Sequence, residues 1–200
     1  MFFAVEPLPQ GLMMALTLAV QFASKAKHAP DRAQVRRWAL AAHGNSGDAE
    51  VTIRYVDEKE GRALSLAYRQ KDYATNVLTF VHDLAPSTRA ATHWSPSAPK
   101  RGRGTPLSKP ILHSKPPHPG SLPQGKRTYA ADIVICAPVI WREAREQKKP
   151  VATHHAHMVL HGVLHAQGFD HELEAEAAVM EATEIALLRR FRIKNPYEIE

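Results

Sequence analysis

The chain has 200 residues, of which 44% are hydrophobic, and its formal net charge is +6. That length and composition can bury one ordinary core, so we expect a single domain over residues 1–200. A lone cysteine, Cys136, excludes an intramolecular disulfide and favours the reducing cytoplasm. The apolar run at 11–20 has no preceding base and is far shorter than the roughly 20 residues that span a bilayer, so we expect neither a secretion signal nor a membrane anchor.

Four segments predict β-strands. LTLAVQFA at 16–23 and VTIRYV at 51–56 alternate large apolar side chains with smaller or polar ones, and NVLTFV at 76–81 follows as a third strand. The continuous apolar run in ADIVICAPVI at 131–140 is typical of a strand that is covered on both faces.

Helices are predicted between and after these strands. DRAQVRRWALAAHG at 31–44 has helical periodicity, and Asp57 with an acid three residues later predicts the N-cap of a second helix. The segment 154–167 is apolar nearly all round, so we expect its helix to be buried against the sheet. A last helix is predicted over 172–190. The pattern predicts an α+β fold with a mixed sheet of about four strands.

A basic, proline-rich segment interrupts this pattern at 85–126. No acid occurs between Leu84 and Ala131, whereas eight bases and nine of the fifteen prolines do. The remaining 18 bases are outnumbered by the 20 acids, so all the excess positive charge lies here. This composition cannot bury enough surface to offset the entropy of ordering, and it predicts a long disordered insertion. The insertion is either a solvated spacer or an electrostatic arm for RNA phosphates.

Three histidines near the end of the buried helix predict a metal site. His161 and His165, four residues apart, project from the same helical face. Gly168 allows the chain to reverse, which brings His171 over that face as a third ligand. Three imidazoles leave the fourth tetrahedral position open, as in catalytic zinc sites.

The sequence predicts smaller roles for the other histidines of this helix. His157 lies one turn further back and is either a substitute ligand or a residue outside the ligand set, and we favour an outer layer of the site or simple packing. His154 and His155 are expected to be exposed residues of the helix start without a role.

A zinc peptidase is the obvious rival, because its pattern HExxHxxGxxH matches the three histidines and Gly168. The peptidase glutamate, which activates water, is replaced here by Gly162. A peptidase therefore requires another carboxylate, such as Asp170, as its general base.

Three blocks of the sequence resemble the YbeY family of bacterial endoribonucleases, which act in ribosomal RNA maturation. HGVLHAQGFDH is similar to the family signature HGxLHxxGxDH, and YRQKDYATNVLTF at 68–80 is similar to YRxKDxPTNVLSFP. ADIVIC at 131–136 resembles GDIVIC, and the ending NPYE resembles the family's tail. Ala131 stands where the family has glycine, which would strain the backbone if that position needs a positive φ.

The resemblance implies a function and a set of site residues. The family's zinc ligands fall on His161, His165 and His171, and its functional arginine falls on Arg69. We therefore expect a zinc-dependent endoribonuclease that cuts single-stranded RNA in 3′-end maturation of 16S ribosomal RNA and in ribosome quality control. His161, His165 and Arg69 would be its catalytic residues, and ribosomal RNA and small-subunit proteins its partners.

Two points stay open. The nucleophile is either water or a ribose 2′-OH. Asp170 is either the general base or a residue that supports a ligand or the turn, and we favour the supporting role. A non-catalytic, RNA-binding assembly factor is the alternative function.

Overall fold

A four-stranded mixed sheet forms the centre of the computed structural model, which describes residues 16–23, 28–44, 46–82 and 128–198. The sheet order is β1-β2-β4-β3, with bounds Leu16–Phe22, Ala49–Val56, Tyr129–Cys136 and Val77–His82 in that order. β1, β2 and β4 are parallel, and the edge strand β3 runs antiparallel to β4. The expected α+β fold with a mixed sheet of about four strands is confirmed.

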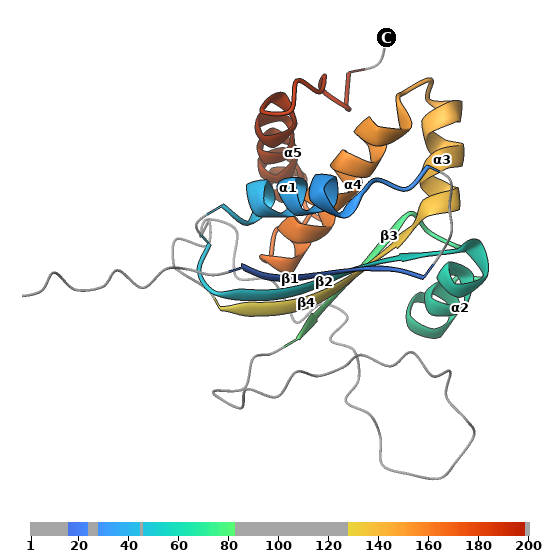
Figure 1. Cartoon of the computed structure of the whole chain (residues 1–200). Helices are drawn as coiled ribbons and strands as arrows, with labels where there is room; N and C mark the ends of the chain where they lie inside the picture. Colours follow the sequence, from blue (N-terminus) through green and yellow to red (C-terminus); the bar gives the residue numbers. More distant parts are fainter. Residues whose placement is uncertain (1–15, 24–27, 45, 83–127, 199–200) are drawn as a thin grey trace, which may run out of the picture.

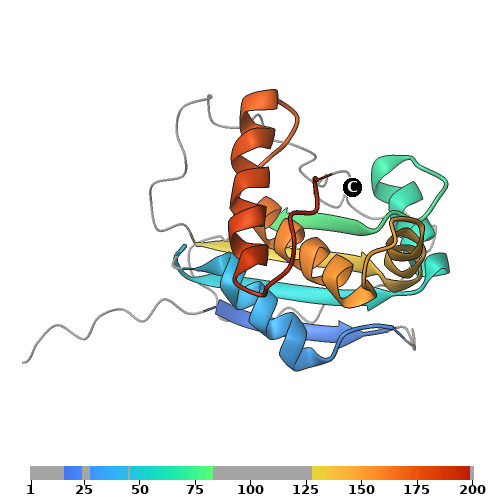
Figure 2. The ribbon, with the colours of Figure 1, turned by 90° about the horizontal axis from the view of Figure 1, so that it is seen from above.

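Five helices accompany the sheet: α1 (Arg32–His43), α2 (Glu58–Arg69), α3 (Ala137–Glu146), α4 (Val151–Ala166) and α5 (Glu174–Arg189). Figure 1 shows α1, α4 and α5 on one side of the sheet and α2 at one end on the opposite side. Seen from above in Figure 2, α1 and α4 lie across the strands. None of the helices in the described part of the chain is long and apolar enough to cross a bilayer.

The two predicted helix starts of the first half are confirmed by their caps. The Asp31 side chain accepts a hydrogen bond from the backbone N–H of Gln34, whose side chain in turn accepts from the Asp31 N–H. The Asp57 side chain accepts from the N–H of Glu60. Each cap satisfies a first-turn donor that has no partner within its helix.

The predicted strand at 131–140 is too long. β4 ends at Cys136, and α3 begins at Ala137 with Pro138 in its first turn. Proline is tolerated there because a first-turn N–H has no partner within the helix. An apolar run does not distinguish a buried strand from the start of a buried helix, so the sequence pattern predicts one continuous strand here. Ala131 lies within β4 and is absent from the positive-φ residues, so the expected strain does not arise.

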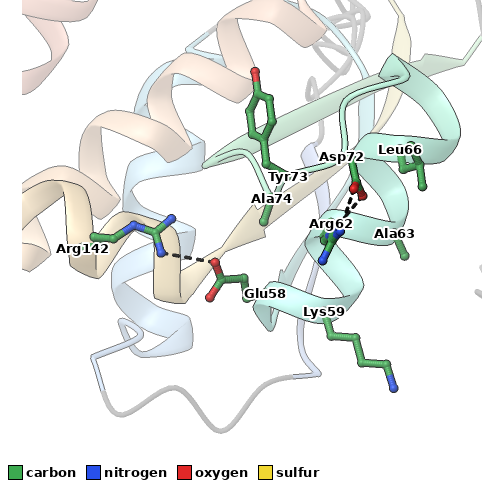
Figure 3. A pocket seen from close by; sticks show the side chains of 9 residues that line it. All are labelled: Glu58, Lys59, Arg62, Ala63, Leu66, Asp72, Tyr73, Ala74 and Arg142. Carbon is green, nitrogen blue, oxygen red and sulfur yellow. Dashed lines mark hydrogen bonds and ion pairs between the residues drawn. The ribbon is translucent and has the colours of Figure 1, made fainter.

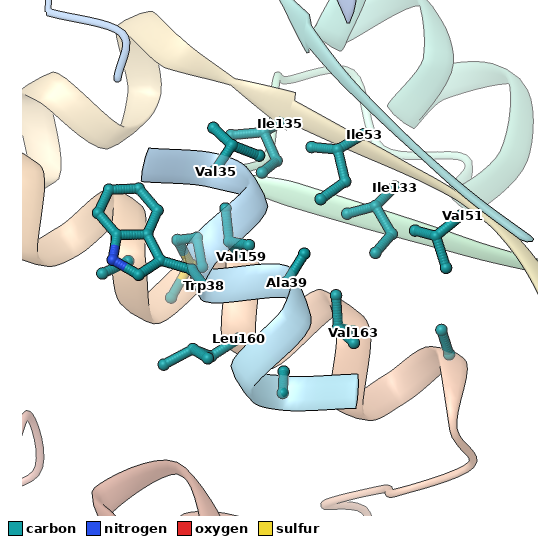
Figure 4. Close-up of a cluster of buried hydrophobic side chains, with 14 of the residues drawn as sticks. Val35, Trp38, Ala39, Val51, Ile53, Ile133, Ile135, Val159, Leu160 and Val163 are labelled. Carbon is teal, nitrogen blue, oxygen red and sulfur yellow. The ribbon is translucent and has the colours of Figure 1, made fainter. Parts of the chain in front are cut away.

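The main core lies between the sheet and helices α1 and α4 (Figure 4). Alternate strand residues point into it, and its fully enclosed members include Ile53, Ile133, Ile135, Val35, Val159 and Val163. A smaller cluster on the opposite face contains Leu78, Val134 and Cys136, with Leu64 of α2 packed against it. β4 is therefore buried on both faces, as its continuous apolar run predicts.

The insertion predicted at 85–126 lies outside the described residues. The strands before and after it are neighbours, since His82 at the end of β3 pairs with Ala130 near the start of β4. The chain therefore leaves and re-enters the sheet at adjacent positions.

Candidate metal centre

The three histidines selected from the sequence lie together. His161 and His165 project from α4, and His171 follows the end of that helix. The candidate ligand atoms of the three side chains lie within 4.8 Å of one another, and the two α4 histidines bring their Nε2 atoms to 3.0 Å. His171 is exposed and the other two are partly buried, so the cluster opens to solvent.

The turn that brings His171 to the helix depends on Gly168. Gly168 has a φ of 91°, and the N–H of Phe169 donates to the Leu164 carbonyl at 3.1 Å. This left-handed glycine ends α4 in the manner that the sequence predicts. The Asp170 carboxylate accepts the N–H of His171 at 2.7 Å, an interaction typical of a turn residue.

Hydrogen bonds to the Nδ1 atoms orient both α4 histidines. His161 Nδ1 lies 2.8 Å from Glu184 Oε1, and His165 Nδ1 lies 2.9 Å from the Phe169 carbonyl oxygen. Because a carboxylate and a carbonyl only accept, each Nδ1 carries the proton and each Nε2 keeps its lone pair. Both Nε2 lone pairs are therefore available to a shared ion.

This arrangement fits zinc. Tetrahedral Zn–N bonds of 2.0 to 2.1 Å place two ligand nitrogens about 3.3 Å apart, close to the His161–His165 separation of 3.0 Å. The three histidines would fill three of the four tetrahedral positions. Cys136 is not a fourth ligand, because it is buried on the far face of the sheet with Val134. A fourth position would remain open for a water or a substrate oxygen, as in catalytic zinc sites.

Burial keeps His165 neutral at physiological pH. Desolvation, with a smaller contribution from the nearby His161 and His171, lowers the pKa of His165 to about 4, although the hydrogen bond with Phe169 acts in the raising direction. A neutral imidazole is the form that binds a metal, so His165 needs no deprotonation at pH 7.

Glu184 is a site residue that the sequence analysis missed. It belongs to α5, and its side chain is 0% exposed. Burial alone would raise the pKa of the Glu184 carboxyl, but hydrogen bonds from His157 and His161 outweigh burial and lower the pKa to about 2. The available signal was its position, since Glu184 falls on the helical stripe of Ala177, Met180 and Leu188 that faces the protein interior.

His157 contacts Glu184 from the next turn of α4. Its Nε2 lies 3.1 Å from Glu184 Oε2, and the Tyr197 hydroxyl donates to the same oxygen. His157 therefore lies one layer out from the three-histidine cluster. His157, His161 and Glu184 also form a second group with ligand atoms close together, which shares His161 with the first.

His154 and His155 are buried, so their expected exposure is wrong. His154 is 6% exposed and its Nε2 lies 2.7 Å from Glu143 Oε2, whereas His155 is 0% exposed and packs against the Tyr55 ring at 5.5 Å. Burial of α4 on several sides extends to its first turn, because α3 and the sheet enclose that end too.

Arg69 is not joined to the histidines. It is the last residue of α2, which packs against β4 and α3, and its side chain is exposed. Across the described ranges, no hydrogen bond, ion pair or ring contact connects Arg69 with the cluster.

A surface pocket of ≈ 760 Å³ lies beside α2 and α3 (Figure 3). Four of its charged side chains form two pairs: Arg62 with Asp72 at 2.6 Å, and Arg142 with Glu58 at 3.2 Å. None of the three clustered histidines lines it.

Gly162 faces the sheet and not the cluster. A Cβ added there would lie 2.7 Å from Cγ2 of Ile133, which is fully buried, and 3.4 Å from Oγ1 of Thr79. Any side chain at this position would therefore clash with β4, so the packing of α4 on the sheet disfavours a glutamate at residue 162.

The chain is similar to known proteins over most of its length. The family model described as Endoribonuclease YbeY matches residues 20–192. The Endoribonuclease YbeY of Thiobacillus denitrificans is 44% identical over 183 residues, covering 91% of this chain and 96% of that protein. The protein of the same name from Aromatoleum aromaticum is 42% identical over 185 residues, covering 91% and 92%.

A solution structure of a Thermotoga maritima protein aligns with 92% of this chain and 100% of its own, with a TM-score of 0.47 and 17% identity. The family is decided by the sequence matches, which extend across the histidine cluster and the sheet. The chain belongs to the endoribonuclease YbeY family.

Proposed function

We propose that this protein is a zinc-dependent endoribonuclease of the cytoplasm. It would cut single-stranded RNA in the 3′-end maturation of 16S ribosomal RNA and in ribosome quality control. One observation supports this most strongly: His161 and His165 bring their Nε2 atoms to 3.0 Å and a ligand atom of His171 lies within 4.8 Å of them, in a chain whose relatives are named endoribonucleases. One zinc ion, held by His161, His165 and His171, is the proposed cofactor.

Each residue has a proposed part. Zinc, when bound, supplies Lewis acidity that either polarises a phosphoryl oxygen or lowers the pKa of a water. His161 and His165 hold their Nε2 atoms toward the ion, since their Nδ1 atoms are engaged by Glu184 and Phe169. The Arg69 guanidinium would donate hydrogen bonds to phosphodiester oxygens and stabilise the charge that develops there.

Arg69 would meet the RNA and not the histidines. Because no hydrogen bond, ion pair or ring contact joins Arg69 to the cluster among the described residues, the RNA itself would connect the end of α2 with the histidines of α4. Ribosomal RNA is the proposed substrate, with small-subunit proteins as neighbours.

The reaction is tested with purified protein on a single-stranded ribosomal RNA fragment and its duplex. We expect cleavage of the single strand, and at least a hundredfold slower cleavage by His161→Ala and Arg69→Ala, which remove a ligand and a charged donor. Cleavage that persists in both variants would identify a contaminating nuclease. Tight binding without cleavage by the wild type would favour the non-catalytic assembly factor.

The product ends decide the nucleophile. Attack by the ribose 2′-OH leaves a 2′,3′-cyclic phosphate, whereas attack by water leaves a linear phosphate. Glu184 is not the general base in this proposal, because it is 0% exposed and its oxygens already accept from other side chains. Mass spectrometry of the cleaved fragment separates the two chemistries.

The basic segment at 85–126 is proposed as an RNA-binding arm of the single domain. Since β3 and β4 are adjacent and antiparallel, a short linker can replace residues 86–123 and still join them. We expect this deletion to weaken RNA binding and to flatten its salt dependence while zinc content stays the same. An unchanged salt slope would reduce the segment to a spacer.

A further inference from the structure

Glu184 connects the histidine cluster with the segment that follows α5. Its Oε1 accepts from His161 Nδ1 at 2.8 Å. Its Oε2 accepts from His157 Nε2 at 3.1 Å and from the Tyr197 hydroxyl. All three donors converge on a carboxylate that is 0% exposed, so none of them competes with water for it.

The segment 194–198 holds the Tyr197 hydroxyl in place. The Tyr197 N–H donates to Asn195 Oδ1 at 3.0 Å, and Lys149 Nζ donates to the Pro196 carbonyl at 2.9 Å. The Tyr197 ring also meets the His157 ring edge-on, with centroids 5.7 Å apart. The position of this hydroxyl is therefore set both within its own segment and from the connection between α3 and α4.

His161 depends on this arrangement more than His165 does. A histidine that binds a metal through Nε2 is oriented by the acceptor at Nδ1, which also raises its basicity. For His165 that acceptor is the Phe169 carbonyl, which the turn after α4 supplies. For His161 it is a side chain on another helix, and Glu184 can serve only while its own position is fixed.

We propose that Glu184 is a positioning residue for His161, and that Tyr197, by donating to its second oxygen, makes segment 194–198 a functional part of the metal centre. This inference rests on the zinc site proposed above. It assigns a role in metal retention to residues that lie outside the three-histidine motif.

The test measures the zinc dissociation constant of the full chain by competition with a chromophoric chelator. Glu184→Gln keeps the shape of the side chain and removes its charge, and we expect zinc binding to weaken by about 10- to 100-fold. Tyr197→Phe removes one hydroxyl from a ring that is 40% exposed, so it should fold normally and weaken binding by a smaller factor. Cobalt substitution adds a second readout, because its visible spectrum reports ligand geometry and should change in Glu184→Gln.

Glu143→Gln is the matched control. It weakens the histidine–glutamate pair of α4 that does not involve Glu184, with His154 Nε2 at 2.7 Å from Glu143 Oε2, and that pair does not contact the three-histidine cluster. Zinc affinity and the cobalt spectrum should match the wild type in this variant.

Three outcomes would overturn the inference: wild-type zinc affinity in both Glu184→Gln and Tyr197→Phe, an equal loss in Glu143→Gln, or two ions per wild-type chain of which Glu184→Gln loses one. The last would mean that His157, His161 and Glu184 bind a second ion. Failure of the wild type to bind zinc would instead contradict the proposed function, so the two failures are distinguishable.

Discussion

Among the histidine–glutamate pairs of helix α4, one near the start of the helix and one about two turns later serve different purposes. His154 pairs with Glu143 of α3, and His161 pairs with Glu184 of α5. The nitrogen that is used distinguishes them. His154 meets its carboxylate with Nε2, the atom at the far end of the ring, whereas His161 meets its carboxylate with Nδ1 and leaves Nε2 pointing at His165.

The choice of nitrogen indicates which histidine is a candidate ligand. The His154–Glu143 pair uses Nε2, the ring nitrogen that reaches furthest. Glu143 also accepts hydrogen bonds from the Asn76 side chain, and these tie the start of β3 to α3. A pair made through Nδ1 orients the ring and presents Nε2 to an ion. The first pair is therefore expected to support the fold, and the second to support the site.

The largest expected effect separates the two ends of α4. His165→Ala removes a direct ligand, and we expect zinc binding to weaken by at least about a hundredfold, more than the loss of an outer partner costs. His154→Ala should retain one zinc per chain, because its Nε2 is committed to Glu143. Mass spectrometry of both purified variants measures the zinc content. Equal loss of zinc in His165→Ala and His154→Ala would contradict the difference between the two ends of α4.

Gly162 tests how closely α4 is held against the sheet. Gly162→Ala places a methyl group 2.7 Å from Ile133 Cγ2, and Ile133 is fully buried and branched at that carbon. Overpacking costs about 1–3 kcal/mol, and the better helix propensity of alanine offsets up to about 1 kcal/mol. A net loss of about 1–2 kcal/mol is expected in urea unfolding, with zinc retained. A variant as stable as the wild type would contradict the close approach.

His155 predicts a pH dependence at the structural end of α4. Burial, chiefly, lowers the pKa of His155 to about 4 from 6.5, and neither of its ring nitrogens has a hydrogen-bond partner among the described residues. Between pH 6.5 and 4, His155 is therefore protonated in the unfolded chain and neutral in the folded one. The free energy of unfolding falls as the pH falls through this window.

His155→Leu should remove this contribution. The variant is expected to be as stable as the wild type at pH 7.5, or more so, because it buries no unpartnered nitrogen. Near pH 5, the free energy of unfolding of the variant should change by about 1 kcal/mol less per pH unit than that of the wild type. Urea unfolding of the zinc-loaded proteins at pH 7.5, 6 and 5 gives the comparison, and parallel slopes would show that His155 does not titrate in this way.

The smallest effect concerns the pair with Glu143. Glu143→Gln keeps the contact with Asn76 but weakens the one with His154, so a loss of about 1 kcal/mol in the free energy of unfolding is expected. Burial raises the pKa of the Glu143 carboxyl, but the hydrogen bonds from His154 and Asn76 outweigh it and lower the pKa. The wild type should lose this stabilisation as the pH falls below 4.5, and the variant should not. The same loss of stability below pH 4.5 in wild type and variant would contradict the pairing of Glu143 with His154.

Local patterns anticipated the parts of the structure that local forces decide. The N-caps at Asp31 and Asp57 and the reversal at Gly168 were all predictable because each involves residues within a few positions. The spacing of His161 and His165 belongs to the same class, since one helix fixes it.

Contacts between distant elements were not predictable in this way. Glu143 and Glu184 reach α4 from two different helices, and nothing near them in the sequence indicates a histidine partner. The burial of His154 and His155 depends on how α3 and the sheet close around the first turn of α4. The run at 131–140 could not be divided into strand and helix because both of its halves are buried.

Zinc titration of the metal-free protein is the most direct test of zinc-dependent RNA cleavage at the three-histidine cluster. The chain is stripped with a chelator, zinc is restored in steps, and cleavage of a single-stranded ribosomal RNA fragment is measured at each step. The rate should rise with bound zinc and saturate at one ion per chain, and His165→Ala should stay inactive throughout. A rate that is independent of zinc, or equal in His165→Ala, would contradict the account.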